Sequence, residues 1–304
     1  MTRCYNTRVA RLARIACALI TLALILPAAA GAYSWPLRPF YKAHVIRGYF
    51  NDPRKVGTTT SFHFGVDIVA ADLEPVYAVE AGRARVRTSS VSVVARGRTL
   101  SYWHIQPAVR NGQFVSFHQV VGYIEPGMEH LHLAEFRNGS YVNPLRMGGL
   151  APFIDDTVPR IPTITYYVAG TVLPIPVAEV RGTVDLTTDA YDVPPLPKPQ
   201  PEWVDTRLAP ALVRWRIVQG HTVVQHWRTA ADFRTFLLPS SLFSFVYAPG
   251  TYQNRPNRPG RYEYFLAQNF DTRTLPNGLY NVEVEAWDTQ ENIGRASYAF
   301  IIGN

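Results

Sequence analysis

The pattern of hydrophobic and polar positions predicts short strands separated by turns over residues 33 to about 150. The expected strands are residues 65–69, 75–79, 84–87, 91–95, 100–105 and 130–136. Asn138 and Gly139 lie between two extended runs, and this dipeptide is a strong signal for a tight hairpin. The abundance of Tyr, Phe and Trp also favours strands over helices.

The pattern changes after about residue 152, where Pro152, Pro159 and Pro162 indicate a linker. Beyond it, hydrophobic residues alternate with polar ones, as expected for sheets with one buried face. The alternating runs are residues 184–186, 213–217 and 280–286. The segment 275–288 is similar to the closing strands of an immunoglobulin-like sandwich. We therefore expect an all-β chain with one domain over residues 33–150 and an immunoglobulin-like β-sandwich over residues 151–304.

The first 32 residues are typical of a secretory signal peptide. Arg3, Arg8, Arg11 and Arg14 precede an apolar run over residues 15–26, and small residues follow. The alternative is a membrane anchor, which needs about 20 apolar residues. This run is shorter and ends at Pro27. We expect residues 1–32 to be removed, so that the mature chain has no transmembrane span and is secreted, into a periplasm or outside the cell.

Removal of this segment changes the charge and the cysteine content. The formal net charge of the whole sequence is +7. Without those four arginines the chain has 26 basic and 23 acidic residues, so its net charge is about +3. This mild excess suits an anionic surface or polymer and does not argue for nucleic acid. Cys4 and Cys17 both lie in the segment. The mature chain is therefore neither a disulfide scaffold nor a cysteine-dependent enzyme or thiolate zinc protein.

The candidate metal-binding residues are histidines and one aspartate. In a strand, His130 and His132 point to the same face, and such a pair occurs in hydrogen-bonded cores as well as in metal sites. His63 and Asp67 flank Gly65 where a loop would enter a strand, although ordinary turn residues show the same spacing. Two histidines and a carboxylate together would suit zinc and leave a fourth position for the water that a hydrolytic metal activates.

Four segments together resemble one protein family. The runs FHFGVDI at 62–68, LSYWHI at 100–105, HLHLAEFRNG at 130–139 and VNPL at 142–145 closely resemble the lysostaphin and LytM-like zinc metallopeptidases of bacterial cell walls. The resemblance covers roughly residues 45–150. It implies an antiparallel sandwich or barrel-like metallopeptidase domain of the duplicated hybrid motif type, and peptidoglycan peptides as the substrate.

The resemblance also implies roles for individual residues. His63, Asp67 and His132 would hold one Zn²⁺ per chain. His104 and His130 would stand beside the zinc-bound water, orient it, shuttle its proton and stabilise the oxyanion. One departure lies just before His130, where residues 122–129 form a shorter and less glycine-rich loop than the family often has. Because that loop forms a wall of the substrate groove, it bears on specificity and access.

Other residues allow two interpretations each. Arg54 would line the groove or be solvated. Asp288 with Glu291 and Asn292 would bind Ca²⁺ or, as the simpler expectation, form an ordinary Asp/Asn turn. Trp203 and Trp215 would offer a surface for sugars or, more simply, pack in the core of the second domain.

The sequence therefore predicts a secreted zinc metalloendopeptidase that hydrolyses peptidoglycan peptides. The alternative is a non-catalytic protein on the same scaffold that binds the wall or regulates a hydrolase. Family members of that kind typically lose metal ligands, whereas this chain has all five expected site residues. An adhesin with structural zinc fits less well, because structural zinc sites are usually closed by four protein ligands. The oligomeric state is not predicted.

Overall fold

The computed structural model describes residues 32–304, and the predicted signal peptide lies outside them except for its last residue. The strands of the first half are β1 Ile46–Gly48, β2 Pro53–Val56, β3 Thr59–Phe62, β4 Val66–Val69, β5 Pro75–Tyr77, β6 Gly82–Arg87, β7 Ser90–Ala95, β8 Arg98–Trp103, β9 Ile105–Pro107, β10 Phe114–Val115, β11 Val120–Ile124, β12 His130–Arg137 and β13 Ser140–Val142. Those of the second half are β14 Arg160–Val168, β15 Pro174–Ile175, β16 Thr183–Tyr191, β17 Leu212–Gln219, β18 Thr222–Asp232, β19 Glu263–Asp271, β20 Gly278–Trp287 and β21 Ile293–Ile302.

Helices are few in this part of the chain. Four residues form the α-helix α2, Phe243–Val246, and three single turns of 3₁₀ helix are η1 Pro201–Trp203, η2 Ser240–Leu242 and η3 Thr272–Thr274. The predicted all-β fold class, built from antiparallel sheets, is confirmed. None of the helices within residues 32–304 has the length and apolar character that crossing a bilayer requires.

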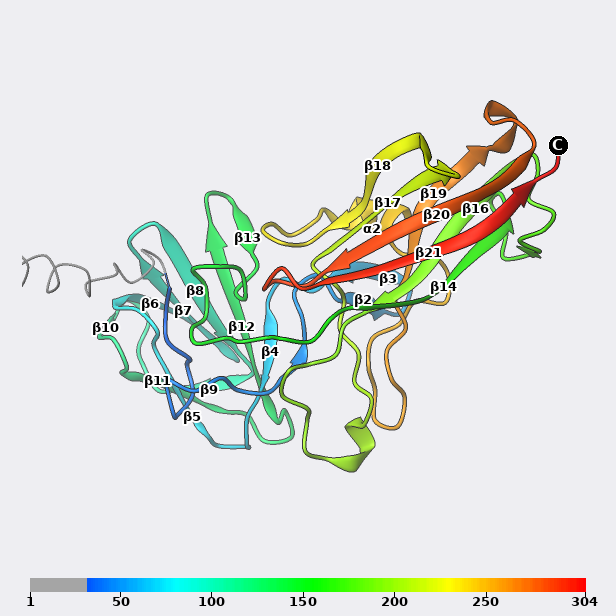
Figure 1. The fold of residues 1–304 in the computed structure, drawn as a ribbon. Coiled ribbons are helices and arrows are strands. Elements are labelled where there is room, and N and C mark those ends of the chain that lie inside the picture. The colour runs from blue at the N-terminus through cyan, green and yellow to red at the C-terminus, as the bar shows by residue number, and fades with distance from the viewer. Residues whose placement is uncertain (1–31) are drawn as a thin grey trace, which may run out of the picture.

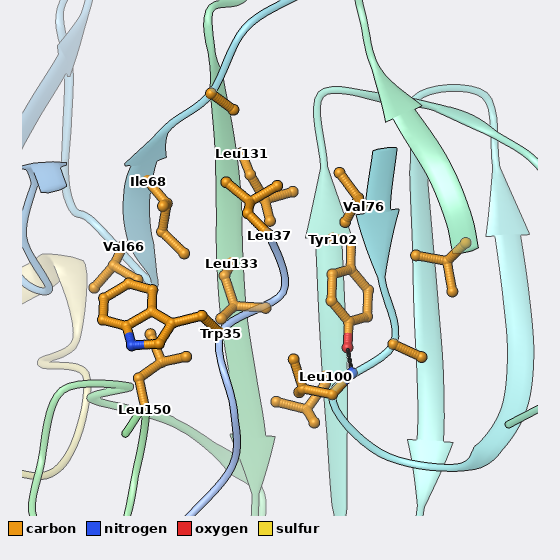
Figure 2. Packing of buried hydrophobic residues seen from close by; sticks show 14 of the residues in the cluster. Trp35, Leu37, Val66, Ile68, Val76, Leu100, Tyr102, Leu131, Leu133 and Leu150 are labelled. Atoms are coloured by element: carbon orange, nitrogen blue, oxygen red, sulfur yellow. Dashed lines mark hydrogen bonds between the residues drawn. The ribbon is translucent and has the colours of Figure 1, made fainter. Parts of the chain in front are cut away.

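The first half forms a large antiparallel sheet, a small one and the two-stranded hairpin β2-β3 (Figure 1). The strand order is β1-β4-β12-β8-β7-β6-β10 in the large sheet, with β13 paired to β12, and β5-β11-β9 in the small one. Their core includes Trp35, Leu131 and Leu133, all fully buried (Figure 2). Within it the hydroxyl of Tyr102 accepts a hydrogen bond of 2.9 Å from the backbone N–H of Val79. This core fixes β12, which carries His130 and His132, and β8, which ends directly before His104.

Five of the six strands expected in this half occur within two residues of their predicted limits. The sixth, expected over residues 100–105, is interrupted at His104, which separates β8 from β9. His104 has a φ of 64° in the left-handed region, which cannot continue a strand. The predicted hairpin joins β12 to β13, and both turn residues, Asn138 and Gly139, have positive φ as the dipeptide signal implies.

The second half consists of two antiparallel four-stranded sheets, β15-β14-β16-β19 and β18-β17-β20-β21 (Figure 1). They share a hydrophobic core that includes Trp215, Tyr264 and Tyr280. All three predicted alternating runs lie in strands, namely β16, β17 and β20. This arrangement is a β-sandwich, and its immunoglobulin-like character stays a prediction.

The two halves meet around the hairpin of β2 and β3. Phe62, the last residue of β3, belongs to the hydrophobic core of the second half. Its ring packs against Phe233, Phe243 and Tyr247 at centroid distances of 5.4 to 6.0 Å. The next residue is His63, so one predicted metal ligand directly follows a side chain anchored in the other core. The division into domains at residues 150 and 151 stays a prediction.

Candidate metal centre

Two neighbouring strands bring the predicted ligands Asp67 and His132 together. β4 and β12 pair antiparallel, and their register places Asp67 opposite His132. Side chains alternate along a strand, so these two share the face opposite to that of Leu131 and Leu133, which lie in the core. His63 enters from the turn between β3 and β4.

Glycine at position 65 makes room for this arrangement. A Cβ there would lie 2.4 Å from the carbonyl oxygen of Leu133 and 2.8 Å from Nε2 of His132. Both distances are too short for any other residue without a shift of β12. Gly65 therefore allows the turn that carries His63 to pass directly beside the His132 ring.

Three potential ligand atoms converge in the space between these side chains. Nε2 of His63 lies 2.8 Å from Nδ1 of His132 and 3.1 Å from Oδ1 of Asp67. Nδ1 of His132 lies 3.0 Å from the same carboxylate oxygen. The side chains of His63 and His132 are buried, and that of Asp67 is 12% exposed. The convergence of two imidazole nitrogens and one carboxylate oxygen on one point is what a metal site requires.

The protonation states of these groups suit a metal ion. The Nδ1–H of His63 donates a hydrogen bond of 2.8 Å to the carbonyl of Tyr49, which leaves the lone pair of Nε2 free. Burial lowers the pKa of His63 to about 3, so the ring is neutral at pH 7. Burial alone would raise the pKa of Asp67, but the adjacent His63 ring, a hydrogen bond from His132 and the charge of Arg54 hold the pKa of Asp67 well below its ordinary value. A neutral imidazole and an ionised carboxylate are the forms that bind metal, and this donor set fits Zn²⁺.

Arg54 holds the other oxygen of the Asp67 carboxylate. Its Nη2 donates a hydrogen bond of 2.7 Å to Oδ2 of Asp67, and its Nη1 donates one of 2.5 Å to Oε1 of Gln253 in the second half of the chain. Gly48 makes room for this pair, because a Cβ there would lie 2.6 Å from Oδ2 of Asp67 and 2.9 Å from Nη2 of Arg54. Arg54 thus fixes the orientation in which Oδ1 faces the two histidines.

His104 and His130 lie along one side of the three ligands. Their ring centroids are 4.6 Å apart, and the His104 ring is 6.3 Å from that of His132. The Nδ1–H of His130 donates to the carbonyl of Met128 at 2.5 Å, and Arg47 donates to its Nε2 at 3.3 Å. Burial lowers the pKa of His130 to about 4, and burial and the charge of His132 lower the pKa of His104. Both rings are therefore neutral at pH 7, and the structure brings all five predicted site residues together.

A cavity of about 410 Å³ contains this cluster. Its walls come from both halves of the chain: Arg47, Asp52, Arg54, Val56, Ser61, Phe62, His63, Phe64, Asp67, Trp103, His104, His130 and His132 from the first, and Trp203, Gln253 and Asn254 from the second. Gln253 and Asn254 were not predicted, because no spacing in the sequence links them to the histidines. A larger cavity of about 1240 Å³ lies against β14, β16 and β19 and includes none of the five site residues.

The two tryptophans considered above differ. Trp215 is fully buried in the second core, as the simpler expectation held. For Trp203 that expectation is wrong, because the residue is only partly buried and lines the cavity of the metal centre. It stacks there with Lys198, whose Nζ lies 3.9 Å from the ring centroid, and with Arg47 at 5.9 Å. Trp203, which contacts two cationic side chains, therefore lines the cavity and does not belong to the core of the second half.

No protein-family model and no curated protein sequence matches this chain. Among solved structures it is similar to the SpoIIQ–SpoIIIAH pore forming complex, at 19% identity over 38% of this chain and 89% of that one, with a TM-score of 0.33. It is similar to the catalytic domain of lysostaphin from Staphylococcus simulans, at 23% identity over 30% and 79%, with a TM-score of 0.27. It is also similar to a zinc containing peptidase from Vibrio cholerae, at 22% identity over 37% and 39%, with a TM-score of 0.32.

The resemblance to lysostaphin-like metallopeptidases expected from the motifs is confirmed, since lysostaphin itself is among these structures.

Proposed function

We propose that this protein is a zinc-dependent metalloendopeptidase that hydrolyses peptide bonds of bacterial peptidoglycan after export and removal of residues 1–32. One observation carries the proposal: the donor atoms of His63, Asp67 and His132 lie within 3.1 Å of one another, and His104 and His130 flank them in the same cavity. A structural zinc site would be closed by a fourth protein ligand. Within residues 32–304 the ligand cluster contains only these three.

Zn²⁺ held by these ligands would supply a Lewis acid that activates water and polarises the scissile carbonyl. The chain itself would move the proton. The Nδ1–H of His130 is donated to Met128, so its Nε2 carries the lone pair; this lone pair accepts a long hydrogen bond from Arg47 and would accept a proton in exchange for it. His104 would donate a hydrogen bond to the oxygen on which negative charge develops. Arg47, next to His130, adds positive charge on that side.

The cavity walls support a peptide of an anionic polymer as the substrate. Phe64, Trp103 and Trp203 offer apolar faces for a peptide backbone and its side chains. Arg47 lines the cavity and offers positive charge for free carboxylates, which stem peptides carry. The mild positive charge of the mature chain is consistent with such a polymer.

The test uses the mature chain and purified sacculi. We expect about one zinc per chain and the release of new amino termini. His132→Ala should lose both zinc and activity. His104→Ala should keep zinc and lose activity by a factor of about 100 or more. His226→Ala, on β18 in the second half, is the matched control and should change neither.

Two results would decide against the proposal. A wild-type chain that binds zinc but releases no termini would favour the alternative of a non-catalytic protein that binds the wall or regulates a hydrolase. A chain that releases termini equally well after His132→Ala would place the reaction elsewhere in the molecule.

A further inference from the structure

Three aspartates from distant parts of the chain meet away from the metal centre. Asp155 follows the last core residue of the first half, Asp192 follows β16, and Asp288 follows β20. One carboxylate oxygen of each lies within 4.8 Å of the other two. The exposed fractions of the three residues are 6%, 1% and 4%. Three carboxylates so close and so well buried repel one another strongly unless a proton or a cation intervenes.

Local groups satisfy only part of this cluster. Oδ1 of Asp155 accepts hydrogen bonds from the N–H and the hydroxyl of Thr157, and Oδ1 of Asp192 accepts one from the N–H of Val193. Oδ2 of Asp155 and Oδ2 of Asp192 are buried and have no hydrogen-bond partner. Within residues 32–304, no lysine, arginine or histidine forms an ion pair with any of the three aspartates.

A tyrosine from the first half of the chain independently marks the same place. Tyr49 is 6% exposed, and its hydroxyl is buried without a hydrogen-bond partner. Tyr49 lines a small cavity of about 10 Å³ together with Asp192, Asp288 and Thr289, and the Thr289 hydroxyl is also buried and unpartnered. A space of this size accommodates about one small ion or water. Burial is the largest cause that raises the pKa of the Tyr49 hydroxyl, and the charges of Asp155, Asp192 and Asp288 come next. The hydroxyl is therefore close enough to the three carboxylates to interact with their charges.

We propose that Asp155, Asp192 and Asp288 bind a Ca²⁺ ion, with the Tyr49 and Thr289 hydroxyls as further oxygen donors. All the available donors are oxygens, which suit hard cations and disfavour zinc. Calcium accepts six to eight oxygen ligands in flexible geometry, whereas magnesium requires a near-ideal octahedron. The side chains come from separate loops of different elements, and this suits the more tolerant ion.

The sequence suggested Glu291 and Asn292 as partners of Asp288 in a calcium site. The structure instead groups Asp288 with Asp155 and Asp192. The expected Asp/Asn turn is present, because Oδ1 of Asp288 accepts the N–H groups of Gln290 and Asn292. The side-chain N–H₂ of Asn292 also donates 2.7 Å hydrogen bonds to Oδ2 of Asp288 and to the carbonyl of Asp155. Asn292 therefore positions two of the carboxylates. Glu291 is exposed and lies outside the cluster.

The competing state of the cluster is a protonated one. Burial, the charge of Asp155 and that of Asp288 raise the pKa of Asp192 to about 8, against a hydrogen bond from the Val193 N–H that lowers it. The apo cluster thus holds a proton at pH 7 that a bound cation would displace. An experiment has to separate cation binding from simple protonation.

Thermal unfolding of the mature chain, with zinc constant and calcium varied up to about 10 mM, makes this separation. Calcium should raise the unfolding temperature of the wild type by several degrees. Asp192→Asn should abolish the rise and unfold no lower than the wild type without calcium, because asparagine mimics the neutral, protonated carboxyl that Asp192 has at pH 7 without the cation. Asp232→Asn, an exposed aspartate paired with Arg234, is the matched control and should keep the rise.

Terbium luminescence gives a second readout, and its first two results come from the wild type alone. Tb³⁺ bound to the wild type should emit when tyrosine is excited, calcium should compete it away, and Tyr49→Phe should weaken the emission. If Asp192→Asn does not fold, Asp155→Asn replaces it. Absence of both a calcium-dependent shift and competed terbium emission in the wild type would overturn the proposal, and so would an undiminished shift in a folded Asp192→Asn protein.

Discussion

Arg54 donates a 2.7 Å hydrogen bond to the oxygen of Asp67 that faces away from His63 and His132. The guanidinium is itself held by Gln253, which is 199 residues away in the sequence. The second half of the chain therefore helps to orient a predicted metal ligand of the first. This relationship gives the C-terminal sheets a role at the site in addition to any role in binding.

Arg54→Gln should weaken zinc binding by a factor of about 10 to 100, because an outer partner that orients a ligating carboxylate has been lost. Gln253→Ala should weaken it less, since Arg54 keeps its bond to Asp67. Competition with a chromophoric chelator measures both affinities. Arg83→Gln, which removes only an exposed arginine bonded to the Gly112 carbonyl, is the control. Equal zinc affinities for Arg54→Gln and wild type would show that Asp67 needs no such support.

His104→Gly should increase stability while it removes activity. The left-handed backbone at His104 disfavours any side chain with a Cβ, so glycine should stabilise the fold by about 1 kcal/mol. Loss of the imidazole should lower the cleavage rate by a factor of about 100 or more. Urea unfolding and sacculus digestion test the two effects. Leu73→Gly, at an exposed residue with the same backbone conformation, should give the stability gain with full activity. A destabilised His104→Gly protein would contradict this account.

The aspartate cluster predicts that stability without calcium falls as pH rises. The folded pKa of Asp192 is about 8, above its ordinary value, so its contribution is fully present below that ordinary value and is lost as pH rises through about 8. The slope for one such proton is at most about 1.4 kcal/mol per pH unit. Calcium should flatten the dependence, and so should Asp192→Asn. Urea unfolding at several pH values, with and without calcium, checks this; identical curves for wild type and variant would refute it.

Trp203→Ala should raise KM about 3- to 10-fold with little change in kcat. The ring lines the cavity but is not among the groups that hold the metal or flank it, so its loss removes binding surface without touching the reacting atoms. Kinetics on a soluble muropeptide separate the two parameters. Trp227→Ala is the matched control, because Trp227 lies on β18 against Arg214 and Arg216. A fall in kcat at constant KM would give Trp203 a different role.

Local pattern was enough to predict the individual strands and the shared face of His130 and His132. The alternation that buries Leu131 and Leu133 requires the two histidines to point to the opposite face, whatever the rest of the chain does. The grouping of all five site residues was predicted only through the family resemblance. Spacing alone left His63 and Asp67 open to an ordinary turn, since the pairing of β4 with β12 is a long-range contact.

The contacts that join the two halves could not be predicted in this way. Arg54 with Gln253, and Phe62 within the second core, depend on how two sheets pack, and no periodicity in the sequence encodes that packing. The aspartate cluster is of the same kind. Asp288 could be connected with its neighbour Asn292, but its partners Asp155 and Asp192 are more than 90 residues away. The interruption at His104 was missed because the flanking residues favour an unbroken strand.

Tyr49 contacts both proposed ion sites in different ways: its backbone carbonyl accepts a hydrogen bond from the His63 ring, and its side chain lines the cavity of the aspartates. An ion that restrains the backbone carbonyl of Tyr49 through His63 also restrains the Tyr49 side chain, and an ion bound at the side chain restrains the carbonyl. Zinc affinity and calcium occupancy should therefore be thermodynamically coupled, and each ion should strengthen the binding of the other by the same factor. The proposed peptidase would then be most active where calcium is plentiful.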